Sequence, residues 1–138
     1  MSDQQHLFVY GTLRREFNHP LARRLARQAH FIGQGSVPGR LYDLGDYPGL
    51  VPASTAGEQV LGDVYHLTDL ARLLPLLDDY EECLPTDPFN SLYLRQEMTV
   101  SLAGGGSCRA WVYLFNRPVK SFRLIPSGDY LSYLQAIG

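Results

Sequence analysis

The segment His6-Leu7-Phe8-Val9-Tyr10-Gly11-Thr12-Leu13 joins a short apolar run to a glycine turn. An apolar run bounded by glycine is typical of a buried strand. Gly11 gives the backbone conformations that a side chain would block, so the amides that follow can point together into a cavity. Such a turn can bind a carboxylate or an oxyanion. The alternative is a turn that only ends the strand.

Strand and helix patterns continue along the rest of the chain. We expect extended segments at residues 31–44, 59–67, 92–102 and 109–114, and helices at 20–26 and 69–81, the second with Thr68 as N-cap. Residues 45–52 are rich in glycine and proline and predict a loop, and a loop at 126–131 leads into a short C-terminal helix. The prediction is one α+β domain over residues 1–138, with about five or six strands and two or three helices.

Composition excludes several classes of protein. The 138 residues are 45% hydrophobic and 19% charged, with a net charge of -2, so a disordered chain, a coiled coil and a nucleic-acid-binding surface are disfavoured. Residues 1–6 lack the features of a signal peptide, and no apolar run approaches the length of a membrane span. We therefore expect a cytoplasmic protein without membrane or nucleic-acid partners, in which Cys83 and Cys108 are reduced thiols.

Motifs for cofactors and metals are incomplete. Gly33-Gln34-Gly35 begins like a dinucleotide fingerprint, but Pro38 and Gly39 prevent the helix that would hold a pyrophosphate. The glycines at 104–106 lack the lysine of a phosphate loop, and no serine lies in a nucleophile elbow. The four histidines show no metal-ligand spacing. The sequence predicts chemistry without a cofactor or a metal.

One acidic residue stands out in the helix expected at 69–81. Leu70, Leu73, Leu74 and Leu77 form the apolar stripe of that helix. At about 100° per residue, Glu81 projects within roughly 20° of Leu70, inside the stripe. Burial raises the pKa of a carboxylate toward neutrality, which suits a group that accepts a proton and later returns it.

The inward direction of Glu81 depends on a regular helix that continues to residue 81, and two features of the sequence bear on this. Pro75 interrupts the helix and is expected to kink or restart it. If the helix ends near Tyr80, Glu81 becomes a solvated C-terminal residue, and the sequence leaves both possibilities open. The neighbouring Glu82 projects about 100° away, toward solvent.

A third pattern lies on the strand expected at 92–102. Tyr93 and Arg95 alternate along it and therefore share one face. Their hydroxyl and guanidinium groups could orient a carboxylate ligand. Arg95 could instead pair with a nearby acid, and an exposed strand face is the remaining alternative.

These patterns belong to a set of motifs that occur in a fixed order between about residues 7 and 115. The motifs are Phe8-Val9-Tyr10-Gly11-Thr12-Leu13-Arg14, Tyr47-Pro48-Gly49-Leu50, Gly62-Asp63-Val64-Tyr65, Leu77-Asp78-Asp79-Tyr80-Glu81, Tyr93-Leu94-Arg95 and Ala110-Trp111-Val112-Tyr113. Together they resemble the gamma-glutamylcyclotransferase-like family, and most closely its gamma-glutamylamine cyclotransferase branch. The chain departs from that pattern beyond residue 115, and at Cys83, where several members carry glycine.

The resemblance implies a small mixed, partly closed β-barrel with flanking helices and a cavity above the glycine turn. It also implies cyclisation of a γ-glutamyl group to 5-oxoproline, with release of the attached amine or amino acid. The family's acid/base glutamate falls on Glu81, and its substrate-binding loop falls on residues 10–13. Tyr10, Gly11, Thr12, Leu13, Tyr47, Tyr93 and Arg95 are the expected substrate-binding residues.

Two other classes of function remain open at this level. The same cavity could bind a small amino-acid-like ligand without chemistry. The protein could also dock a partner through a sheet edge or through its tail, residues 129–138. An enzyme is favoured because a buried acid is costly to keep in a pocket that only binds.

Overall fold

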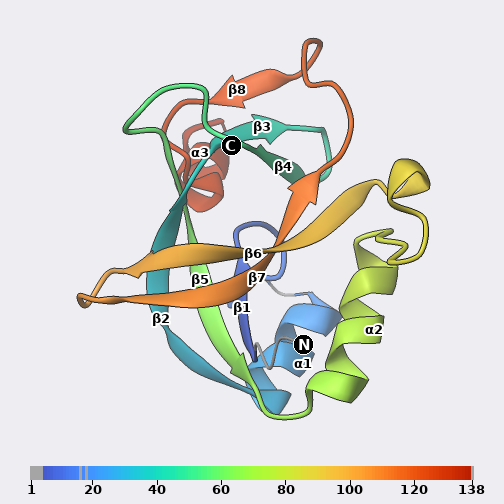
Figure 1. Cartoon of the computed structure of the whole chain (residues 1–138). Helices are drawn as coiled ribbons and strands as arrows, with labels where there is room; N and C mark the ends of the chain where they lie inside the picture. Colours follow the sequence, from blue (N-terminus) through green and yellow to red (C-terminus); the bar gives the residue numbers. More distant parts are fainter. Residues whose placement is uncertain (1–4, 16, 18, 138) are drawn as a thin grey trace.

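The computed structural model describes residues 5–15, 17 and 19–137 (Figure 1). Residues 1–4 of the polar start and Gly138 of the tail lie outside the described part. The strands are β1 (His6–Val9), β2 (Ala29–Pro38), β3 (Arg40–Asp43), β4 (Pro48–Val51), β5 (Gln59–Leu67), β6 (Tyr93–Leu102), β7 (Ser107–Phe115) and β8 (Arg123–Ile125). The helices are α1 (Pro20–Gln28), α2 (Leu70–Tyr80), α3 (Tyr130–Ile137) and a 3₁₀ turn, η1 (Pro88–Asn90).

Five strands form a closed barrel in the order β1-β5-β2-β6-β7. Neighbouring strands are antiparallel except at the closure, where β1 runs parallel to β7 with Leu7 opposite Trp111. This arrangement confirms the expected α+β fold with a small mixed barrel. The long β6–β7 hairpin also agrees with the sequence, with its turn between Leu102 and Ser107.

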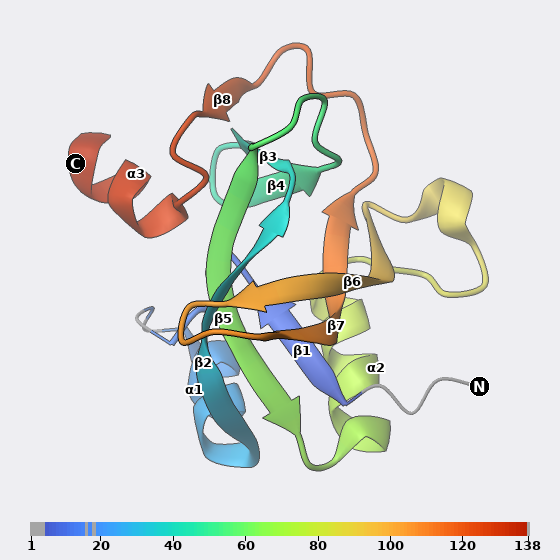
Figure 2. The same ribbon diagram turned by 60° about the vertical axis from the view of Figure 1, so that its left-hand side comes forward.

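Strand β1 is buried on both faces, which explains its unbroken apolar sequence. Phe8 packs into the cluster of buried residues that also holds Val64 and Val112. Leu7 and Val9 face the other way, into the cluster beneath α1 and α2. The two helices lie on one side of the barrel (Figure 2). Because β1 lies between the two clusters and packs into both, the packing of its two faces fixes where the following turn begins.

A second sheet of three strands, in the order β4-β3-β8, lies beyond the end of the barrel with α3 beside it (Figures 1 and 2). The sequence did not predict it: residues 45–52 were expected to be loop, yet they contain β4, and the segment that forms β8 carried no strand prediction. Proline and glycine are poor strand formers, but β4 is held on one edge of β3 by ladder hydrogen bonds and is buried at Pro48, Gly49 and Leu50. This strand brings Pro48 to the glycine turn after β1.

Helix α2 begins one residue later than the sequence predicted. Asp69, rather than Thr68, is its N-cap, and the Thr68 hydroxyl instead donates to the carbonyl oxygen of Gln28. Leu73 and Leu77 are buried as the stripe requires. Pro75 lies inside the helix on its exposed side and does not end it. No helix among the described residues is long and apolar enough to cross a membrane.

Candidate active site

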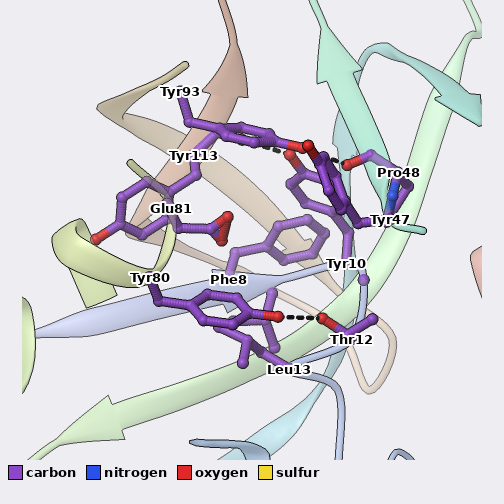
Figure 3. A pocket seen from close by; sticks show the side chains of 12 residues that line it. Phe8, Tyr10, Thr12, Leu13, Tyr47, Pro48, Tyr80, Glu81, Tyr93 and Tyr113 are labelled. Atoms are coloured by element: carbon purple, nitrogen blue, oxygen red, sulfur yellow. Dashed lines mark hydrogen bonds between the residues drawn. The ribbon is translucent and has the colours of Figure 1, made fainter. Parts of the chain in front are cut away.

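A pocket opens where β1 runs into its glycine turn (Figure 3). The barrel, the turn, β4 and the end of α2 all contribute to its wall. Its lining residues are Phe8, Val9, Tyr10, Gly11, Thr12, Leu13, Tyr47, Pro48, Tyr80, Glu81, Tyr93 and Tyr113. Seven of the eight residues expected at the site therefore meet around one hollow, and Arg95 does not line it.

Glu81 directs its carboxylate into this pocket, among the rings of its neighbours (Figure 3). It is partly buried, and burial raises its pKa from 4.5 to about 8. The titratable groups near enough for their own pKa values to respond to its charge are those of Tyr10, Tyr80, Cys83, Tyr93 and Tyr113. Among the lining residues Glu81 is the one carboxylate, and most of the others are aromatic or apolar.

The way α2 ends explains the direction of Glu81. The helix does stop at Tyr80, as one of the two open possibilities required, but Glu81 is not solvated. The amide of Glu82 donates to Asp79 O and that of Cys83 to Asp78 O, at 3.2 and 2.8 Å, which is the hydrogen-bond pattern of a Schellman motif. Glu82 takes the left-handed position of this motif, with φ 52°, and is exposed.

The tyrosine hydroxyls of the pocket are tied to the protein. Tyr10 Oη donates to Tyr113 O at 2.6 Å and accepts from the amide of Leu50 at 3.3 Å. Tyr93 Oη donates to Pro48 O at 2.8 Å. Burial raises the pKa of both phenols well above 10. Tyr10 and Tyr93 therefore offer ring faces to the pocket, while their hydroxyls hold the β4 segment in place.

The turn after β1 is closed by a hydrogen bond from the amide of Arg14 to Gly11 O, at 3.0 Å. Gly11 is not among the residues with positive φ, so the expected reason for glycine here is wrong. The reason is close approach: a Cβ on Gly11 would lie 2.9 Å from Cδ and Cγ of Pro48. At the mouth, Thr12 Oγ1 and Tyr80 Oη share a hydrogen bond of 2.7 Å.

Arg95 takes the second of its expected roles, an ion pair with a nearby acid. Its Nε and a terminal nitrogen donate to Asp78 at 2.8 and 3.1 Å, so its guanidinium is not available to the pocket. Asp78 was not foreseen as this partner, and the lining residues outside the expected set are Phe8, Val9, Pro48, Tyr80 and Tyr113. Strand register points to Tyr113, because it lies directly opposite Arg95 in the β6–β7 hairpin.

No group of three or more His, Cys, Asp and Glu side chains suited to a metal ion occurs in residues 5–15, 17 and 19–137. What the pocket offers is one carboxylate with a raised pKa, a wall of aromatic rings, and a main-chain turn at its rim. This combination can exchange a proton with a small ligand and hold it against flat apolar surfaces.

A protein family and several of its members match this chain over nearly its whole length. The family described as Gamma-glutamyl cyclotransferase, AIG2-like matches residues 7–132. The Gamma-glutamylcyclotransferase family protein YtfP of Escherichia coli (strain K12) is 31% identical over 131 residues, which cover 91% of this chain and 95% of that protein.

Two crystal structures share the fold. An AIG2-like protein from Mus musculus superposes with a TM-score of 0.74 at 28% identity, covering 94% of this chain and 89% of its own. YkqA from Bacillus subtilis superposes with a TM-score of 0.72 at 26% identity. The match covers 96% of this chain and 42% of YkqA, so YkqA is a much longer protein.

Proposed function

This chain belongs to the gamma-glutamyl cyclotransferase, AIG2-like family, and we propose that it cyclises a γ-glutamyl amine or γ-glutamyl amino acid to 5-oxoproline and releases the free amine. The observation that carries this proposal is the placement of Glu81. Its carboxylate faces the pocket, and burial raises its pKa from 4.5 to about 8, toward that of an α-amine. Proton transfer between the two groups therefore costs little free energy in either direction.

The substrate supplies its own nucleophile in this reaction. Ionised Glu81 takes a proton from the α-ammonium group, and the resulting amine attacks the γ-carbonyl carbon to form the ring C–N bond. Glu81 then gives that proton to the leaving nitrogen as the original amide C–N bond breaks. After the attack the ring nitrogen carries two protons, and the lactam product keeps one of them. The other passes to Glu81 and leaves with the departing amine or is transferred to water. Atoms and charge balance without any co-reactant.

Positioning supplies much of the remaining rate enhancement. An intramolecular attack held in the reactive geometry can lower the barrier by about 7–11 kcal/mol. The rings of Tyr10, Tyr47 and Tyr93 are the walls that fold the γ-glutamyl chain. The main-chain amides of Gly11, Thr12 and Leu13 are the donors for its α-carboxylate or for the developing oxyanion.

The competing proposal is a module of the same fold that binds a small ligand without chemistry. A carboxylate held in an apolar wall destabilises the protein when it ionises, so a pocket that only binds has no use for it. The aromatic rings alone would suffice for binding.

The experiment is an incubation of the purified chain with a panel of γ-glutamyl amines and γ-glutamyl dipeptides, read by mass spectrometry for 5-oxoproline. We expect 5-oxoproline and an equal amount of free amine from at least one member of the panel. If calorimetry shows tight binding but no member of the panel yields product, the protein is a binding module and not an enzyme.

A further inference from the structure

Asp78 lies one helical turn before Glu81, and its side chain is bound to strands β6 and β7 of the barrel. Its carboxylate accepts three hydrogen bonds from two strands: Arg95 Nε at 2.8 Å, a terminal nitrogen of Arg95 at 3.1 Å, and Tyr113 Oη at 2.6 Å. Asp78 is buried, and the side chains of Asp78 and Arg95 are only 11% and 18% exposed. The guanidinium also stacks over the ring of Trp111, 4.7 Å from its centroid. Arg95 therefore has one fixed position.

The main chain of the same turn is held as well. The carbonyl of Asp78 accepts the amide of Cys83, and the carbonyl of Glu82 accepts the amide of Leu92, at 2.8 and 2.9 Å. Asp78 thus fixes the end of α2 by two sets of hydrogen bonds. Its carbonyl oxygen binds the turn that ends the helix, and its carboxylate binds β6 and β7. Glu81 sits between these two attachments.

Tyr113 connects this network to the pocket directly. Its hydroxyl is bound to Asp78, while the residue itself lines the pocket beside Glu81 (Figure 3). Its carbonyl oxygen also accepts the hydroxyl of Tyr10. A shift of Asp78 would move the wall of the pocket as well as the turn that carries Glu81.

We propose that the Asp78–Arg95 ion pair, with the Tyr113 hydroxyl, is a positioning device that holds the Glu81 carboxylate in the pocket and keeps it dry. Asp78 and Arg95 are positioning residues, since neither lines the pocket. The inference rests on the proposed function only in taking Glu81 as the working carboxylate. A buried ion pair adds little net stability against an apolar pair, so fixing geometry is the better explanation for its presence.

The charges around Glu81 give the proposal a measurable consequence. Asp78, Arg95 and Glu81 all act on the pKa of the Cys83 thiol, so the three charges lie around one residue. In Asp78→Asn, the Arg95 cation loses its counter-charge and the turn loses its anchor. Loss of the anchor lets water reach Glu81 and so favours its ionised form, because burial is what raises the pKa of this carboxyl.

The test is the pKa of the Glu81 carboxyl, followed by carbon NMR of the free protein and therefore independent of turnover. We expect it to fall by about two units in Asp78→Asn and by about one unit in Tyr113→Phe, which removes one hydroxyl and leaves the ion pair intact. The matched control is Glu58→Gln, which breaks the Arg40–Glu58 ion pair away from this pocket and should leave the pKa unchanged.

Each outcome decides the proposal. If Glu81 titrates as in the unmodified protein in both variants, the network does not position it and the proposal is wrong. If Asp78→Asn does not fold, Tyr113→Phe decides alone. A protein that shows these pKa shifts but makes no 5-oxoproline would refute the proposed function and leave the positioning role intact.

Discussion

Glu81 and Glu82 are adjacent in sequence and lie in opposite environments. Glu81 faces the pocket with a pKa raised to about 8, and Glu82 is exposed at the left-handed position that ends α2. Because the Schellman motif ends α2 between these two residues, their side chains point in different directions, and only the Glu81 carboxylate is available for chemistry. The pair provides a site residue and its internal control in a single dipeptide.

The left-handed backbone of Glu82 predicts a stabilising substitution. A residue with a Cβ pays about 1–2 kcal/mol in this conformation, and glycine does not. After allowing for the greater freedom of glycine in the unfolded chain, we expect Glu82→Gly to raise the free energy of unfolding by about 1 kcal/mol. Urea unfolding measures it. A loss of stability would mean that the Glu82 side chain contributes more than its backbone costs.

The buried carboxyl predicts how stability changes with pH. The pKa of Glu81 is about 8 in the folded protein against 4.5 unfolded, so between these values the folded state holds a proton that the unfolded state lacks. Its contribution is complete below pH 4.5 and is lost as the pH rises through 8, at a cost of up to about 5 kcal/mol.

Glu81→Gln lacks this titration. Relative to the unmodified protein, the variant should therefore gain stability from pH 4.5 to pH 8.5, as measured by urea unfolding at several pH values. Comparing the two proteins removes the contribution of every other titrating group. Parallel pH dependences would show that Glu81 titrates near its ordinary value.

The same pKa predicts the pH profile of turnover. A general base must be ionised in the free enzyme and the α-amine must carry the proton that the base takes, so kcat/KM should increase about tenfold per pH unit below 8 and fall again above the pKa of the α-ammonium group. Initial rates of 5-oxoproline formation between pH 5.5 and 9 give the profile. A rate that stays constant from pH 5.5 to 8 would rule out a base with a raised pKa.

Gly62 lies at a position of the barrel where there is no room for a side chain. A Cβ there would collide with the carbonyl oxygen of Val9 and lie 2.7 Å from Cζ of Phe8, at the strand that leads into the pocket. We expect Gly62→Ala to lower the free energy of unfolding by about 3 kcal/mol. Gly104, in the hairpin turn, has nothing within 4 Å and no positive φ, so Gly104→Ala should be nearly neutral. Thermal unfolding of both variants makes the comparison, and equal effects would contradict the packing described here.

Local periodicity carried much of the prediction from sequence. The apolar run of β1, the leucine stripe of α2 and the long β6–β7 hairpin were all expected, because each buries a regular pattern of side chains. Helical periodicity offered the inward direction of Glu81 as one of two open possibilities, and the Schellman turn, rather than a continued helix, produces it.

Features that depend on contacts distant in sequence could not be predicted in this way. Strand β4 exists because β3 pairs with it, and its Pro48-Gly49 start gives no strand signal. The hydroxyls of Tyr10 and Tyr93 bind carbonyl groups 103 and 45 residues away, so their roles as wall supports are invisible in the sequence. Arg95 had an acid partner among several candidates, and only the fold selects Asp78.

The most direct measurement is the rate of 5-oxoproline formation by Glu81→Gln beside Glu82→Gln, with the fold of each checked by circular dichroism and ligand binding by calorimetry. We expect Glu81→Gln to fold and bind but to lose at least about 10²-fold in kcat, while Glu82→Gln keeps its rate. Full turnover by a folded Glu81→Gln protein would show that this carboxylate does not move the proton.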